Sequence, residues 1–327
     1  MSIRIPEVSS LGKQVIAEVE EAVVGKHSLL EMVMAAVLAG GHLLLEDYPG
    51  LGKTLIAKSF AAVLGLDFKR IQFTPDLLPG DITGGYVFNP RSSGVNRAEN
   101  RFELIKGPIF ANIILADEIN RASPKTQSAL LEAMQEGQVT LEGETLPLPD
   151  PFLVLATQNP IEYEGTFPLP EAQLDRFMLK LKVGYPSVEE EKEILQRRYQ
   201  RKQEDVALKR VAKPSQILQM RQAVETVHVE EDLETYIAEI IHETRRDRHV
   251  AVGASPRGSL AFLKMARAHA ALDGRDYILP DDIKRFAVPI LSHRLILQPE
   301  YWLNRQIADD IIADVFAKVA VPVVNGA

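Results

Sequence analysis

Three segments near the start of the chain follow one another in an order that few folds accept. A short apolar run (residues 42–45) leads into the loop Pro49-Gly50-Leu51-Gly52-Lys53-Thr54, and a helix-forming stretch (residues 55–64) follows. In such a loop, the backbone N–H groups and the positive end of the next helix dipole surround a phosphate group. The order therefore predicts an α/β fold with an anion site at the end of a strand.

The polar residues of this loop have separate roles if the anion is a nucleoside triphosphate. Gly50 and Gly52 supply backbone freedom, Lys53 reaches the β and γ phosphates, and the hydroxyl of Thr54 ligates magnesium. Asp47 stands where the general pattern of such loops has a glycine. The alternative is a Gly-Lys-Thr sequence that merely opens a helix. It is disfavoured because a lysine in the first turn opposes the helix dipole unless an anion is bound.

The chain has 327 residues, enough for two domains. Its first part alternates helix-compatible segments with short apolar runs, which is the pattern of a parallel α/β sheet. The five runs are residues 42–45, 68–73, 112–116, 152–157 and 177–183. After Gly184 the sequence changes to successive amphipathic helices without strand-like runs. We predict an αβα domain over residues 1–183, with a helical segment at its start, and an all-helical second domain over residues 184–327.

Two stretches of the first part fit β-hairpins inserted between elements of the sheet. In one, residues 86–88 and 102–105 flank a middle rich in Pro, Gly and Asn. In the other, residues 138–148, apolar and polar residues alternate on both sides of a Glu-Gly-Glu turn. Surface decoration is the alternative interpretation for each.

Two carboxylates, Asp117 and Glu118, directly follow the third apolar run. Open α/β sheets bind their ligands at the carboxyl ends of strands. Asp117 is therefore placed to hold magnesium through its hydration shell, and Glu118 to accept a proton from the water that attacks the γ phosphate. Alone, such a pair is more often a solvated strand end. Beside the phosphate loop it predicts an active site.

Three further polar residues are candidates, each with an alternative. Asn159 follows the fourth run and either orients the attacking water or makes an Asx turn. Arg176 precedes the last run and either stabilises phosphoryl charge in a neighbouring subunit or forms a surface ion pair with Asp175. Arg257 follows Ser255 and Pro256, which predict the N-cap and the first turn of a helix. An arginine there opposes the helix dipole, which favours an anionic partner.

The composition of the chain disfavours or excludes several kinds of partner and site. The chain has 37 basic and 45 acidic side chains, a net charge of -8, which disfavours nucleic acid unless a local basic surface overrides it. It has no cysteine, which excludes disulfides, thiolate metal sites and a cysteine nucleophile. Its longest charge-free apolar stretch, residues 32–45, is shorter than the roughly 20 residues that a membrane span needs, and its start offers no secretory segment. We expect a soluble, cytoplasmic protein without a membrane span.

Together these motifs resemble the AAA+ ATPases, and more closely the MoxR branch of the clade that inserts a hairpin in helix 2. The most specific stretches are residues 116–127 (ADEINRASPKTQ), 130–136 (LLEAMQE) and 169–177 (LPEAQLDRF). The resemblance covers nearly the whole chain. It implies an AAA+ P-loop core with a five-stranded parallel sheet, two inserted β-hairpins and a C-terminal all-helical lid domain.

The resemblance also implies residue roles. It makes the loop Walker A, Asp117 and Glu118 Walker B, Asn159 sensor 1, Arg176 the arginine finger and Arg257 sensor 2. Catalysis would then depend on Glu118, Asn159, Arg176 and Arg257, and Mg²⁺ would be held by Thr54 and Asp117. The residues expected to contact ATP are Val24 and Gly25 by the adenine, then Pro49, Gly50, Leu51, Gly52, Lys53, Thr54 and Leu55, with Asp117 and Arg257. Asp47 is a departure that is familiar in MoxR sequences.

The implied function is Mg²⁺-dependent ATP hydrolysis by a homo-oligomeric ring, taken as a hexamer. The ring would remodel or mature protein clients, for example in metal or cofactor insertion, with a separate protein that carries a von Willebrand factor A domain. The alternative is a DNA-remodelling or DNA-translocating motor, because helicase-like relatives share the hairpins. Residues 138–148 include two glutamates and no basic residue, a poor surface for DNA phosphates. A third interpretation is a nucleotide-gated scaffold with negligible turnover.

Overall fold

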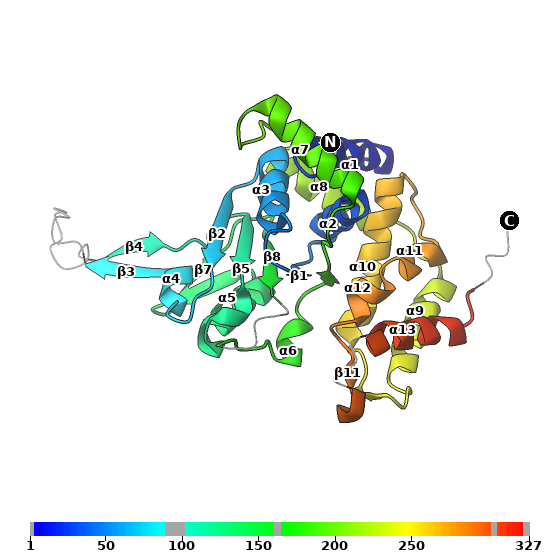
Figure 1. The fold of residues 1–327 in the computed structure, drawn as a ribbon. Helices are drawn as coiled ribbons and strands as arrows, with labels where there is room; N and C mark the ends of the chain where they lie inside the picture. Colours follow the sequence, from blue (N-terminus) through cyan, green and yellow to red (C-terminus); the bar gives the residue numbers. More distant parts are fainter. Residues whose placement is uncertain (1–2, 89–101, 160–164, 302–305, 323–327) are drawn as a thin grey trace.

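The structure is a computed structural model, and it describes residues 3–88, 102–159, 165–301 and 306–322. A central sheet and a large group of helices share one body, and a long hairpin extends from the side of the sheet (Figure 1). Among the described residues, no helix is both long and apolar enough to cross a membrane.

The central sheet has five parallel strands in the order β2-β5-β8-β1-β9. Each apolar run that the sequence singled out forms one of them, which confirms the predicted parallel sheet. The strands are β1 (Leu43–Glu46), β2 (Phe68–Gln72), β5 (Ile113–Asp117), β8 (Leu153–Gln158) and β9 (Leu179–Leu181). The register places Leu43 of β1 opposite Leu155 of β8 and Leu179 of β9.

Both faces of the three inner strands, β1, β5 and β8, are buried, which is why these strands are apolar without strict alternation. On β1, Leu43 and Leu45 pack against α1, α2 and α3, whereas Leu44 packs in a second cluster with Leu130 of α5. The helices of this part are α1 (Ile5–Glu20), α2 (His27–Ala39), α3 (Lys53–Leu64), α4 (Pro79–Thr83), α5 (Pro124–Glu136) and α6 (Glu171–Leu174).

Both predicted hairpins are present. The first is β3 (Gly84–Phe88) with β4 (Phe102–Lys106), and the second is β6 (Gln138–Leu141) with β7 (Glu144–Pro147). At the base of the first, a Cβ on Gly107 would lie 2.2 Å from the carbonyl oxygen of Ile82, so only glycine fits there. The hydroxyl of Tyr86 donates to the carboxylate of Glu144 and joins the hairpins. The Pro, Gly and Asn-rich middle, residues 89–101, lies outside the described residues.

The part after Gly184 is helical, as expected, with one difference. Val250–Val252 (β10) and Ile296–Leu297 (β11) form a short antiparallel pair, which the prediction of helices alone missed because two or three residues leave no periodic pattern. The helices are α7 (Val188–Arg201), α8 (Pro214–Val224), α9 (Glu231–Thr244), α10 (Pro256–Asp273), α11 (Pro280–Lys284), α12 (Ala287–Leu291) and α13 (Gln306–Lys318). Helices α1 and α2 pack against α10. One hydrophobic cluster contains residues of these helices and of the sheet, so it spans both predicted domains.

Candidate functional site

The glycine-rich loop joins β1 to α3 at the carboxyl end of the sheet. Gly50 and Gly52 have φ angles of 84° and 82°, a region that glycine adopts without strain. A Cβ at either position would meet no other atom within 4 Å, so conformation and not space requires glycine. Lys53 begins α3, and its ammonium donates a hydrogen bond to the carbonyl of Asp47.

The ammonium of Lys53 lies among carboxylates. Burial lowers the pKa of Lys53, and the charges of Asp47, Asp117 and Glu118 partly offset that shift. An ammonium at the start of a helix, beside a loop with left-handed glycines, is an arrangement that binds phosphate. The loop therefore fits the phosphates of a nucleotide.

Asp47, the departure from the general loop pattern, is a buried anchor. Its carboxylate accepts the N–H of Tyr48 at 2.8 Å and the N–H of Gly184 at 2.6 Å. Because Gly184 follows β9, these bonds tie the phosphate loop to the end of the neighbouring strand. A glycine at this position has no side chain to accept either bond.

Asp117 ends β5, and both of its carboxylate oxygens have partners. Oδ1 accepts from the hydroxyl of Thr157 at 2.6 Å, and Oδ2 accepts from Nη2 and Nε of Arg70 at 2.6 and 3.0 Å. The hydroxyl of Thr157 also accepts the N–H of Glu118 at 2.8 Å. One threonine of β8 therefore aligns both acids.

These side chains fit magnesium. The carboxylate of Asp117 and the hydroxyl of Thr54 are hard oxygen donors, the type that Mg²⁺ prefers. Arg70 already pairs with one oxygen of Asp117, so the guanidinium and a cation compete for the same carboxylate.

Glu118 has an unusual backbone. Its φ and ψ are 57° and 50°, a left-handed conformation that costs a residue with a side chain about 1–2 kcal/mol. Such outliers concentrate at functional sites. The carboxylate accepts a hydrogen bond from Nε2 of Gln72 at 2.8 Å and lies 3.2 Å from Nε of Arg121. Gln72 and Arg121 therefore hold Glu118 in place.

Asn159 directly follows β8, the strand between β5 and β1, and it is buried. The carboxyl ends of parallel strands meet at one edge of a sheet. The structure accordingly brings Lys53, Asp117, Glu118 and Asn159 to the same edge. The segment 160–164 lies outside the described residues.

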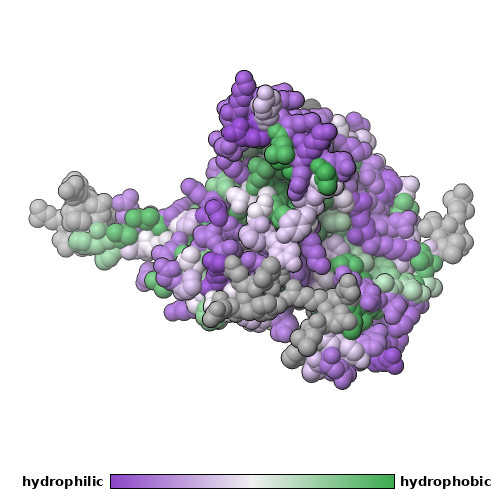
Figure 2. All heavy atoms as spheres, in the orientation of Figure 1, coloured by the Kyte–Doolittle hydropathy of each residue, from purple (hydrophilic) through white to green (hydrophobic). Residues whose placement is uncertain are grey.

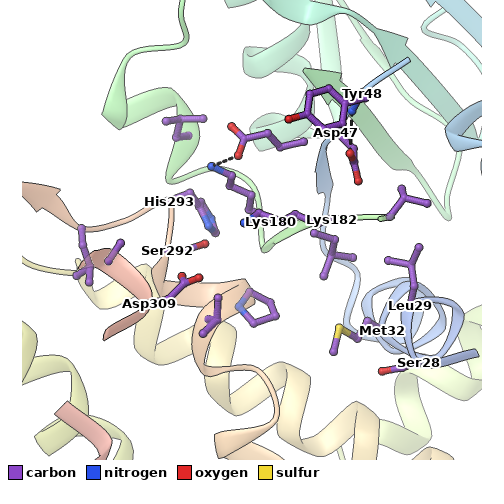
Figure 3. A pocket seen from close by; sticks show the side chains of 18 of the residues that line it. Ser28, Leu29, Met32, Asp47, Tyr48, Lys180, Lys182, Ser292, His293 and Asp309 are labelled. Carbon is purple, nitrogen blue, oxygen red and sulfur yellow. Dashed lines mark hydrogen bonds and ion pairs between the residues drawn. The ribbon is translucent and has the colours of Figure 1, made fainter. Parts of the chain in front are cut away.

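A cleft of about 1150 Å³ opens beside the phosphate loop. Gly25, Asp47 and Tyr48 line it at one end, and residues of α2, α6, β9, α12 and α13 line other parts of it (Figure 3). Lys180 of β9 pairs with Glu46 at 2.7 Å. Gly25 is thus beside the loop, as expected for a residue near the base of a nucleotide, whereas Val24 is buried and does not line the cleft.

Arg176 and Arg257 lie together, away from the loop. Both line a second pocket of about 240 Å³, which Gly41 and His42 also line. Arg176 donates from Nη1 to the carbonyl of Leu131 at 2.7 Å, and its buried Nε has no hydrogen-bond partner among the described residues.

Asp175 positions the second arginine. The predicted alternative, an ion pair between Asp175 and Arg176, is wrong: Asp175 pairs with Arg294 at 2.9 Å and lies 3.8 Å from Arg257. Arg294 reaches Asp175 from the end of α12, which the local sequence could not indicate. The hydroxyl of Ser255 donates to Asp175 at 2.9 Å while it caps α10, which confirms the expected cap.

The two groups lie at opposite ends of the sheet. Strands β1 and β9 are parallel and paired, with Leu43 opposite Leu179. Arg176 precedes β9 and His42 precedes β1, whereas the phosphate loop follows β1. Four strand residues span about 13 Å. The structure therefore does not bring Arg176 and Arg257 to the phosphate loop of the same chain.

Sequence reasoning missed Thr157, Arg70 and Gln72. Thr157 is the one polar residue within an otherwise apolar run, and Arg70 and Gln72 alternate along β2. The available signal for such a residue was a polar side chain near the end of a buried strand. The residue to which it hydrogen-bonds could be known only from the order of the strands.

The parallel sheet, the phosphate loop and the acidic strand end define a P-loop nucleotide-binding protein. The family model described as "ATPase family associated with various cellular activities (AAA)" matches residues 42–179, and the AAA lid domain matches residues 242–315. Both matches agree with the architecture.

Relatives extend over nearly the whole chain. An uncharacterized protein YeaC from Bacillus subtilis is 48% identical over 97% of this chain and 96% of its own. Chaperone MoxR1 from Mycobacterium tuberculosis is 42% identical over 98% of this chain and 84% of its own. A crystal structure of a putative ATPase from Cytophaga hutchinsonii superposes with a TM-score of 0.86 at 42% identity, covering 97% and 96% of the two chains. The chain belongs to the MoxR family of AAA+ ATPases, and it is an ATPase.

Proposed function

We propose that the carboxyl edge of the sheet hydrolyses ATP with magnesium. Lys53 faces the β and γ phosphates, Thr54 and Asp117 hold the ion, and Glu118 accepts the proton of the attacking water. Asn159 orients that water. The observation that carries the proposal is the convergence of these side chains with a strained Glu118 beside the phosphate loop. The adenine then lies toward Gly25, at the loop end of the large cleft.

Arg176 and Arg257 act on the nucleotide of a neighbouring copy. They add positive charge for the transferring phosphoryl group to that of Lys53, because Arg70 and Arg121 at the carboxyl edge are paired with Asp117 and Glu118. Their position at the amino end of β9, beside a pocket open to solvent, supports this role. Hydrolysis then depends on assembly into a ring, which we take as a hexamer.

The work that hydrolysis drives is chaperone-like remodelling or maturation of protein clients, such as insertion of a metal or cofactor. Two observations support it: a relative is named as a chaperone, and the β3–β4 hairpin projects as an apolar arm (Figure 2). On this arm Phe88 is 50% exposed and Phe102 is 65% exposed, with their rings 5.7 Å apart. Exposed aromatic side chains fit a protein surface. A separate protein with a von Willebrand factor A domain would present the client.

The substitution Glu118→Gln tests the active site. The amide keeps the shape of the side chain but cannot take a proton, so turnover should fall about a hundredfold while ATP still binds. Calorimetry measures binding and phosphate release measures turnover. Glu132→Gln, an exposed change on α5, is the matched control. Wild-type turnover in Glu118→Gln would move the base to another residue.

The same variant tests the class of client. Held in ATP, it should retain proteins that mass spectrometry can identify after affinity isolation. Duplex or single-stranded DNA should leave the ATPase rate of the wild type unchanged at moderate salt. Strong stimulation by DNA would replace the protein client with a nucleic acid.

A further inference from the structure

Helix α7 presents its apolar side to solvent. Val188, Leu195 and Tyr199 are 79%, 70% and 82% exposed, and spacings of seven and four residues put them on one stripe. The opposite side is polar: Nη1 of Arg197 donates to the carbonyls of Glu20 and Glu21 at 2.6 and 3.1 Å. No residue of α7 is buried. Figures 1 and 2 place this helix at the outside of the molecule, with green apolar atoms over it.

This α7 stripe begins at the phosphate edge. The chain enters α7 from Gly184, whose N–H is bound by Asp47. The ring of Tyr185 lies 5.8 Å from that of Tyr48, and the side chain of Glu190 lies against Gly25. A protein that packs over the phosphate loop would therefore also contact the α7 stripe.

A complementary surface lies on α10. Arg257, Leu260 and Lys264 share one side of this helix, and Leu260 is 55% exposed between the two cations. These three residues, called here the α10 face, line the same pocket as Arg176. The first turn of α7 contains Glu189, Glu190 and Glu191. Each surface thus has an exposed aliphatic side chain. On α7 the acidic residues lie in the first turn and the basic residues Arg198 and Arg201 lie in the last turn, whereas Arg257 and Lys264 make the α10 face basic.

We propose that the α7 stripe of one copy packs against the α10 face of the next copy. The proposal rests on the function above, because the same contact carries Arg176 and Arg257 to the neighbour's phosphate loop. The partner is a second copy, because the acidic first turn of α7 complements the basic α10 face. Both surfaces also continue into the two edges that hydrolysis must join. Two different patches make the contact heterologous, so it closes into a ring when the rotation permits.

Two single substitutions test the contact. Leu195→Glu damages only the α7 stripe and Leu260→Glu damages only the α10 face. In each variant every copy has the same damaged surface, so no intact α7 stripe can meet an intact α10 face. Each variant should therefore stay monomeric in ATP and magnesium, under conditions where the wild type assembles. Mixed, they should form a one-to-one heterodimer, because one intact surface of each kind remains. Native mass spectrometry measures all three states.

Matched controls isolate the surfaces from folding and general charge. Gln196→Glu adds the same charge to α7 beside the stripe, and Val252→Glu alters a residue of β10 that is 54% exposed. Both should assemble as the wild type does. Melting temperature and ATP affinity should match the wild type in Leu195→Glu and Leu260→Glu. Wild-type assembly by either variant, or a mixture of folded chains that stays monomeric, would overturn the contact.

Activity of the heterodimer separates this proposal from the one it rests on. Its single joined site holds the nucleotide of the Leu260→Glu chain and the arginines of the Leu195→Glu chain. Adding Glu118→Gln to the first chain should abolish turnover, whereas adding it to the second should not. If the heterodimer forms but does not hydrolyse ATP, the proposed contact stands and the proposed role of the arginines is wrong.

Discussion

The two ends of strand β1 have unlike chemistry. At the carboxyl end, Lys53, Asp117 and Glu118 surround a loop that fits phosphate. At the amino end, Arg176 and Arg257 line a pocket without such a loop. The carboxyl end can bind a nucleotide. Within the same chain, however, neither arginine of the amino end reaches it. Under the proposed function, one copy therefore carries both halves of an active site without placing them together.

The largest effect on ATP affinity should come from Lys53→Ala at the carboxyl end. Loss of an ammonium that faces two phosphates removes charged hydrogen bonds worth about 1.5–3 kcal/mol each, so ATP affinity should fall about a hundredfold or more. Lys58→Ala is the control, because Lys58 lies on the same helix with its side chain 64% exposed. Calorimetry on both proteins checks the result. Equal ATP affinity in Lys53→Ala and Lys58→Ala would mean that the loop does not bind the nucleotide.

At the amino end, Arg176→Ala should separate binding from turnover. ATP affinity should stay within about twofold, whereas turnover should fall about a thousandfold, as is typical when an arginine finger is lost. Arg246→Ala, which removes a cation 67% exposed, should change neither. Circular dichroism must accompany the assay, because the guanidinium also binds the carbonyl of Leu131.

Mixing decides which copy the arginine serves. Arg176→Ala and Glu118→Gln proteins, each nearly inactive, should regain some turnover when their subunits exchange. A mixed interface then pairs an intact Glu118 with an intact Arg176. An arginine that acts within its own chain gives no such recovery. Absence of recovery would therefore mean that Arg176 does not act on the nucleotide of a neighbouring copy.

Most of the carboxyl end could be predicted from the sequence, because its residues are local to their strands. Apolar runs set β1, β5 and β8, and the polar residue after each run is a candidate. The pairings could not be predicted: Arg70 meets Asp117, and Thr157 joins both acids, only because the strand order is β2-β5-β8. The amino end was harder still, since Asp175 takes its main partner, Arg294, from 119 residues away.

Acid should loosen the amino end. His42 accepts the N–H of Val154 on Nδ1 at 3.0 Å, and Nε2 contacts the carbonyl of Met134 at 2.9 Å. Burial lowers the pKa of His42 to about 4. Because the folded pKa lies below the unfolded value, stability is intact above about pH 6.5 and is lost as pH falls toward 4. The loss attributable to His42 is at most about 3 kcal/mol.

Denaturant unfolding at pH 7 and pH 4.5 measures this loss. His42→Gln should cost stability at pH 7 and should reduce the fall between the two pH values. The control is His228→Gln, which changes a histidine whose side chain is 63% exposed. A fall in stability that is identical in the wild type and His42→Gln would assign the acid sensitivity to other groups, of which buried His293 is the first candidate.

The smallest expected effect returns to the carboxyl end, at Arg70. Its guanidinium, 49% exposed, pairs with Asp117 at 2.6 Å, and an exposed ion pair of this type is worth about 0.2–1 kcal/mol. Arg70→Gln removes a competitor of the cation, so the Mg²⁺ concentration for half-maximal ATPase activity should fall by up to about fivefold. Lys69→Gln removes the same charge from the opposite side of β2 and should leave that concentration unchanged. A higher Mg²⁺ requirement in Arg70→Gln would mean that Arg70 holds Asp117 ready for the ion. The pairing would then belong to the active state, and Arg70 would assist the carboxyl end as Lys53 does.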